Sequence, residues 1–71
     1  MNPINPAKLL NSKWTAVHPQ NKEKHFLVSD IDRDEEGVVI SCTLEAVMTK
    51  SEYLLDWTEL KNNAVWMQGW K

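Results

Sequence analysis

The stretch VVISCTLEAVM, residues 38–48, alternates apolar and more polar side chains along its length. A period of two predicts a β-strand with one buried face and one wetter face. We expect the buried face to carry every second residue: Val38, Ile40, Cys42, Leu44, Ala46 and Met48. Because 11 residues are long for a strand, we also expect a bend or bulge partway along it.

The segment EYLLDW, residues 52–57, is predicted to form the next strand after a turn at Lys50-Ser51. A two-residue loop there aligns apolar residues across one face, pairing Met48 with Tyr53, Ala46 with Leu55 and Leu44 with Trp57. The same register places Glu45 opposite Asp56, where like charges repel each other. We therefore expect a nearby lysine to relieve this pair, or the strands to splay before they reach it.

Two further strands are predicted before residue 38. KWTAVH, residues 13–18, is rich in aromatic and β-branched residues and is expected to end at Pro19. Residues 19–24 are predicted to form a polar loop, and HFLVSDI, residues 25–31, the second strand. Near the C-terminus, residues 59–63 favour a single helical turn with Thr58 as its N-cap. Residues 65–70 then form a last short strand or a docked tail.

This order of elements predicts an all-β fold in a single small domain. We expect a bent antiparallel meander of four to five strands, with a short helical turn before the C-terminal segment. An SH3-like barrel is the favoured closure, because five short strands cannot cover two full faces as a sandwich. Residues 1–12, which contain two Asn-Pro steps, are predicted to form an N-terminal arm, and residues 13–71 the β domain.

The amino-acid composition indicates a cellular compartment and disfavours some classes of partner. Cys42 is the only cysteine among 71 residues, so no disulfide forms within the chain and a reducing, cytoplasmic setting is expected. No apolar run resembles a signal peptide or a membrane span, so no membrane association is expected. The net charge of −2 does not favour nucleic acid as a partner.

Acidic, histidine and cysteine residues do not follow the full spacing of a known metal-binding or catalytic motif. The run Asp30 to Gly37 has the D-x-D-x-D spacing of a calcium loop, but it lacks that loop's glycine and terminal glutamate, and a solvated hairpin turn at Gly37 is favoured. His18 and His25 flank the predicted loop and form a metal site only if Cys42 joins them; a buried, apolar role for Cys42 is favoured. No metal, no cofactor and no catalytic residues are therefore predicted.

Tryptophan is abundant, with four residues in this short chain: Trp14, Trp57, Trp66 and Trp70. We expect Trp14 and Trp57 to belong to the core. Trp66 and Trp70 are four positions apart, a spacing that places them on one face of a strand or a helix. That face either closes the barrel or forms an exposed apolar patch for a partner.

Several segments resemble a small bacterial family of tryptophan-rich proteins of unknown function: SKWTAV (12–17), KEKHF (22–26), LEAVMTK (44–50), DWTELK (56–61) and the tail from Trp66 to Trp70. The tryptophan spacing and the closing Gly69-Trp70 carry most of the likeness. The resemblance implies a cytosolic bacterial domain that stands alone, and it implies no activity.

These observations favour a non-enzymatic binding or interaction module with an unknown protein partner. The candidate binding surface comprises Trp66, Trp70, Lys13, Lys22, Lys24 and His25. The alternative is a nucleic-acid or ribonucleoprotein accessory domain, in which Lys13, Lys22 and Lys24 and the nearby aromatic rings contact the strand. Nucleic acid is not favoured, and a monomer or a weak homodimer is expected.

Overall fold

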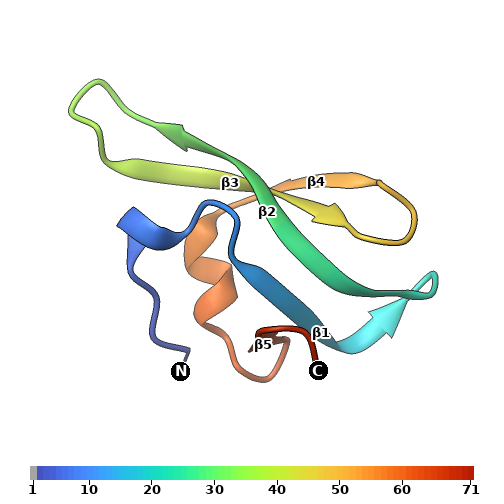
Figure 1. The fold of residues 1–71 in the computed structure, drawn as a ribbon. Helices are drawn as coiled ribbons and strands as arrows, with labels where there is room; N and C mark the ends of the chain where they lie inside the picture. The colour runs from blue at the N-terminus through green and yellow to red at the C-terminus, as the bar shows by residue number, and fades with distance from the viewer. Residues whose placement is uncertain (1) are drawn as a thin grey trace.

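The chain folds into one five-stranded antiparallel sheet in a computed structural model that describes residues 2–71 (Figure 1). The strands are β1 (Lys13–Gln20), β2 (Glu23–Arg33), β3 (Val39–Ala46), β4 (Glu52–Leu55) and β5 (Trp66–Gln68), in the spatial order β4-β3-β2-β1-β5. Two short 3₁₀ helices, η1 (Pro6–Lys8) and η2 (Trp57–Lys61), complete the fold. The all-β prediction and the antiparallel meander are confirmed.

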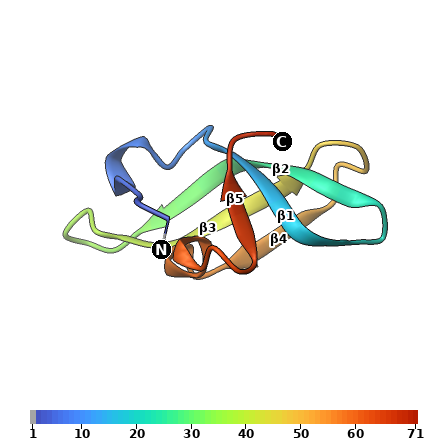
Figure 2. The same ribbon diagram turned by 90° about the horizontal axis from the view of Figure 1, so that it is seen from below.

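The core lies on the face of this bent sheet that η2 covers, and it includes Leu60 of η2. Figures 1 and 2 show η2 lying beside the sheet. Its buried members come from all parts of the chain: Leu9, Trp14, Phe26, Val28, Val39, Cys42, Leu44, Ala46 and Leu60. Trp57 and Trp66 are partly buried against this cluster. Trp14 is 2% exposed, so its predicted place in the core is confirmed.

A bulge divides β3, as its length predicted. Between the pairs Asp32–Ser41 and Arg33–Val39 the register shifts, and Ile40 is the extra residue. Cys42, Leu44 and Ala46 point into the core as predicted, but beyond the bulge the alternation reverses. Val39 is buried instead, and Ile40 is 52% exposed. The expectation that Val38, Ile40 and Met48 are buried was wrong, since all three are exposed.

The predicted register between β3 and β4 was also wrong. Leu44 faces Tyr53, because a four-residue loop connects the strands where the sequence had suggested a two-residue loop. Hydrogen bonds of 2.8 Å from Ala46 N to Ser51 O and from Lys50 N to Ala46 O close this loop. Trp57 therefore lies beyond the strand, in η2. The expected Glu45–Asp56 pair does not form: Glu45 faces Glu52, and Lys50 Nζ lies 4.0 Å from the Glu45 carboxylate.

The β1–β2 hairpin is tighter than the polar loop predicted for residues 19–24. β1 continues through Pro19 to Gln20, and only Asn21 and Lys22 form the turn. Pro19 is tolerated because the ladder to β2 is irregular between Thr15 and Gln20. Both turn residues have positive φ angles, 55° and 63°, which define a type I′ hairpin turn.

Substituting glycine for Lys22 is expected to stabilise the protein by about 0.5–1 kcal/mol, because a side chain at positive φ costs roughly 1–2 kcal/mol while glycine adds some unfolded-state entropy. Chemical denaturation measures the difference. Lys24→Gly, one step into β2, is the matched control and should destabilise by about 0.5–1 kcal/mol. Equal losses for the two variants would contradict the turn assignment.

The segments outside the sheet are fixed by short polar contacts. Asp56, not the predicted Thr58, caps η2: its carboxylate accepts a 3.0 Å hydrogen bond from Thr58 N, which lowers the pKa of Asp56. At the other end, Asn2 donates from its backbone to Lys61 O and from its side chain to Leu60 O, both at 2.8 Å. The segment predicted to form an arm, residues 1–12, is therefore attached to η2 at Asn2, while Asn11 and Ser12 hydrogen-bond Val28 in β2.

The sheet is open. β4 and β5 are its two edges, and no strand within residues 2–71 pairs with the outer side of either. The element order is the one expected for an SH3-like barrel, but the closure of that barrel is not confirmed. The two free edges instead face each other across a hollow.

Candidate functional site

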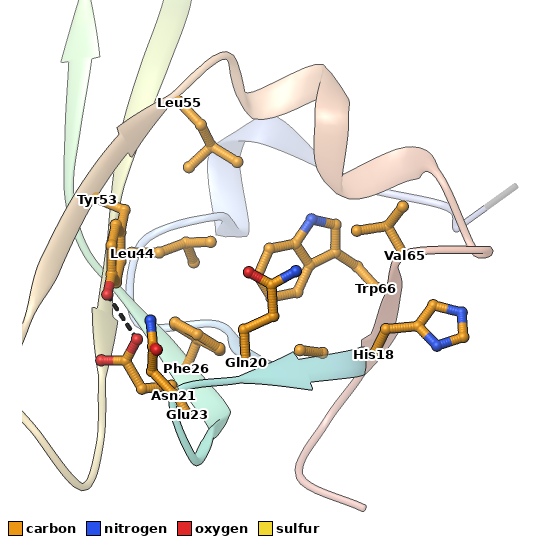
Figure 3. Close-up of a pocket in the computed structure, with 11 residues that line it drawn as sticks. His18, Gln20, Asn21, Glu23, Phe26, Leu44, Tyr53, Leu55, Val65 and Trp66 are labelled. Atoms are coloured by element: carbon orange, nitrogen blue, oxygen red, sulfur yellow. Dashed lines mark hydrogen bonds between the residues drawn. The ribbon is translucent and has the colours of Figure 1, made fainter.

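A pocket of about 460 Å³ lies between β4 and β5, where the sheet stays open (Figure 3). Tyr53 and Leu55 form one side, and Val65 and Trp66 the other. The remaining lining residues are Ala16, Phe26 and Leu44, together with four from the β1–β2 hairpin: His18, Gln20, Asn21 and Glu23. The volume falls within the range of small-ligand and side-chain sites.

Three aromatic rings line this pocket. The Phe26 ring meets Trp66 edge-to-face, with centroids 5.2 Å apart and an interplanar angle of 89°. It meets Tyr53 in a similar arrangement at 6.2 Å and 63°. Phe26 is buried in the core, Trp66 is partly buried, and Tyr53 remains 44% exposed. Together the three rings form an aromatic wall that runs from β4 to β5.

The carboxylate of Glu23 also lines the pocket, beside the Tyr53 ring (Figure 3). Glu23 is 6% exposed, and its oxygens accept hydrogen bonds from the hydroxyls of Thr49 and Tyr53, the latter at 2.5 Å. These two bonds lower the pKa of Glu23, the Thr49 bond most, while the bond to Glu23 raises the pKa of Tyr53. The site therefore holds an ionised carboxylate and a protonated phenol at neutral pH.

The indole of Trp66 offers the pocket a donor. The other three indole N–H groups donate within the protein: Trp14 to Ser12 Oγ at 2.9 Å, Trp57 to Val39 O at 2.9 Å and Trp70 to Phe26 O at 3.0 Å. Trp66 Nε1 makes no hydrogen bond within residues 2–71, and no buried side-chain nitrogen or oxygen there lacks a partner, so this N–H reaches solvent. A second hollow of about 280 Å³, which Glu59 and Asn62 help to line, shares Leu55, Val65 and Trp66 with the pocket.

The residues of the predicted binding surface do not all lie together in the structure. Lys13, His25 and Trp70 lie together: Lys13 Nζ is 4.8 Å from the Trp70 ring centroid, and the His25 ring is 6.0 Å from it. Trp66 belongs to the pocket instead. Lys22 is exposed at the hairpin turn and Lys24 is exposed in β2.

Trp66 and Trp70 do not share one face, which corrects the prediction from their spacing. β5 ends at Gln68, and Gly69, with φ of 80°, turns the chain. Trp66 packs toward Phe26 on the core face, whereas Trp70 crosses the other face, beside His25. There Thr15 Oγ1 donates to Gly69 O at 2.7 Å and accepts from Lys71 N at 2.9 Å, so the tail covers Thr15 completely. Trp70 itself remains 44% exposed.

The structure does not assemble the metal sites considered from sequence. Among residues 2–71, no group of three or more histidine, cysteine, aspartate or glutamate side chains is arranged to hold a metal ion. The acidic run forms a turn: Asp34 Oδ1 accepts from Glu36 N and Val38 N, both at 2.9 Å, and Gly37 has φ of 84°. None of the helical segments in residues 2–71 has the length and apolar character that a membrane crossing requires.

Cys42 gives the fold a measurable dependence on pH. Burial, aided by the charges of Asp56 and Glu59, raises the pKa of the thiol from 9.0 to about 11. The thiol's contribution to stability is complete below pH 9.0 and should be lost as the pH rises toward about 11, because the unfolded chain releases its proton first. Denaturation in reducing buffer on both sides of pH 9.0 tests this, with Cys42→Ala as reference. Identical pH profiles for both proteins would contradict it.

Sequence reasoning missed most of the pocket. Glu23 had been assigned to a solvated loop, and no pattern indicated that Thr49 and Tyr53 would meet it. Tyr53 and Phe26 were expected in strands, but the wrong register across β3 and β4 hid their proximity. The unpaired edges of β4 and β5 carry no sequence signal of their own.

The fold and the pocket together define a small open-sheet β domain with an aromatic cleft between its edges. The profile of the family described as Tryptophan-rich protein (DUF2389) matches residues 12–71. The chain therefore belongs to this tryptophan-rich family of unknown function, as the resemblance predicted. No curated protein and no solved structure matches the chain.

Proposed function

We propose that this domain is a non-enzymatic interaction module of the bacterial cytosol, and that it binds a segment of a protein partner in the cleft between β4 and β5. The observation that carries the proposal is an aromatic pocket that opens between two unpaired strand edges. Unpaired edges offer backbone donors and acceptors to an extended chain, and adjacent pockets receive its side chains.

The shape of the cleft favours a peptide over a compact small molecule. The pocket and the second hollow share Leu55, Val65 and Trp66, so together they form an elongated cleft that reaches η2. Trp66 lines both hollows, and its free indole N–H is a donor of the kind that a backbone carbonyl of a bound segment accepts. Protein recognition commonly combines such buried aromatic anchors with a few directed hydrogen bonds.

Selection from a random peptide library displayed on phage tests this function. Ala16→Phe should fill the pocket, because Ala16 lines it beside Trp66, its cross-strand partner. Leu54→Ser is the matched control: Leu54 is 70% exposed and does not line the pocket. Peptides enriched on the wild-type protein should bind Leu54→Ser equally and should lose Ala16→Phe. No enrichment, or equal binding to the folded Ala16→Phe variant, would contradict the proposal.

The second candidate is single-stranded nucleic acid at Trp70. The observation in its favour is the cluster of Lys13, His25 and Trp70, in which a lysine and an imidazole lie beside an exposed indole. The overall charge of −2 opposes it. An oligonucleotide should then quench tryptophan fluorescence in the wild type, less in Trp70→Ala, and the quenching should weaken steeply with salt. Absence of quenching at low salt would end this reading.

A further inference from the structure

We infer that the aromatic pocket selects a cationic side chain, the ammonium of lysine or the guanidinium of arginine, from the partner segment; this inference rests on the proposed function. The pocket sets a carboxylate beside three aromatic rings, and it contains no lysine or arginine of its own. Its ionisable lining residues are His18, Glu23 and Tyr53, and Glu59 lines the adjoining hollow.

Glu23 lacks the positive charge that a buried carboxylate usually has nearby. Among residues 2–71 the one ion pair within 4.0 Å joins Glu45 of β3 to Lys50 in the β3–β4 loop, so it does not involve Glu23. Thr49 and Tyr53 each occupy one Glu23 oxygen. A carboxylate has about four acceptor positions, so acceptor capacity remains for a further donor. An incoming ammonium or guanidinium supplies both the donor and the missing charge.

The rings around Glu23 suit the same ligand. A cation over the face of an aromatic ring is attracted by the negative charge of its π system, and the attraction grows when water is excluded. Tyr53 holds the carboxylate directly, while Phe26 and Trp66 extend the aromatic surface away from it. The alkyl stem of a lysine or arginine can lie along these rings while its charged end reaches Glu23.

The protein shows this chemistry elsewhere on its own surface. Lys13 Nζ lies 4.8 Å from the Trp70 ring centroid, and Lys61 Nζ lies 4.9 Å from that of Trp57. Trp66 is the partly exposed tryptophan to which no cation of residues 2–71 is assigned. A ligand cation in the pocket would form with Trp66 the cation–π contact that lysines form with Trp57 and Trp70.

Two simple probes test the inference, n-butylammonium and its neutral counterpart 1-butanol. Nuclear magnetic resonance at low salt should show saturable shifts of the Tyr53 and Trp66 signals, with n-butylammonium bound about 10- to 100-fold more tightly than 1-butanol. Glu23→Gln keeps the size and an acceptor but removes the charge, and it should reduce the ammonium affinity to that of the alcohol.

The outcomes separate the inference from the proposed function. Equal affinity for the two probes in the wild-type protein, or no shift at the pocket with either, overturns cation selection without needing any variant. Glu23→Gln that is folded and retains the full preference for the ammonium also overturns it. If library peptides still depend on an open pocket in that case, the proposed function stands and recognition of a neutral side chain replaces this inference.

Discussion

Trp14→Ala is expected to remove about half of the domain's stability. Trp14 is the largest fully buried side chain, and its loss to alanine should cost about 3–5 kcal/mol in transfer free energy and cavity formation. A chain of 71 residues has a total stability of about 4–10 kcal/mol. The variant should therefore unfold at a much lower temperature and urea concentration than the wild type.

Trp70→Ala is the matched control for this prediction. Its ring is 44% exposed, and it lies on the face opposite the core. Circular dichroism of this variant should match the wild type, with a cooperative transition at a modestly lower temperature. If Trp14→Ala retained that transition and Trp70→Ala lost it, the assignment of the two faces of the sheet would be wrong.

Leu60→Ala is the second substitution with a large expected effect, about 2–5 kcal/mol. Leu60 is fully buried and is the one buried residue of η2, so this helix is attached to the core chiefly through it. The midpoint of urea denaturation measures the loss. Glu59→Ala removes an exposed neighbour and should change stability by less than about 0.5 kcal/mol. Similar effects for both variants would show that η2 does not cover the core.

The core-facing half of β3 could be predicted from sequence because a period of two is a direct consequence of strand geometry. Cys42, Leu44 and Ala46 followed it. The pattern could not locate the bulge at Ile40, since the apolar residues Val38, Val39 and Ile40 satisfy either phase equally. The length of the strand indicated that a bulge was needed, but not its position.

Turn geometry accounts for the remaining differences in the fold. Asn21, Lys22 and Lys50 adopt positive φ angles, and lysine at such positions gives no signal comparable to glycine. The β3–β4 loop is consequently longer, and the β1–β2 loop shorter, than their composition suggested. A change in loop length moves every cross-strand pair, so Tyr53 rather than Trp57 faces Leu44.

The candidate site depended on these same details. Trp66 could be singled out because tryptophan is rare and the sequence holds four. Its separation from Trp70 requires the turn at Gly69, and its proximity to Glu23 requires both hairpin registers. A buried carboxylate within an aromatic wall is therefore a product of tertiary structure that no local pattern encodes.

The most direct measurement of the proposed cation site is the set of nuclear Overhauser contacts between bound n-butylammonium and the protein. We expect contacts from the methylene next to the nitrogen to the Tyr53 ring, because Tyr53 hydrogen-bonds Glu23, and from the rest of the chain to Phe26 and Trp66. Contacts to Trp70 alone, or a bound orientation with the methyl end beside Tyr53, would contradict it.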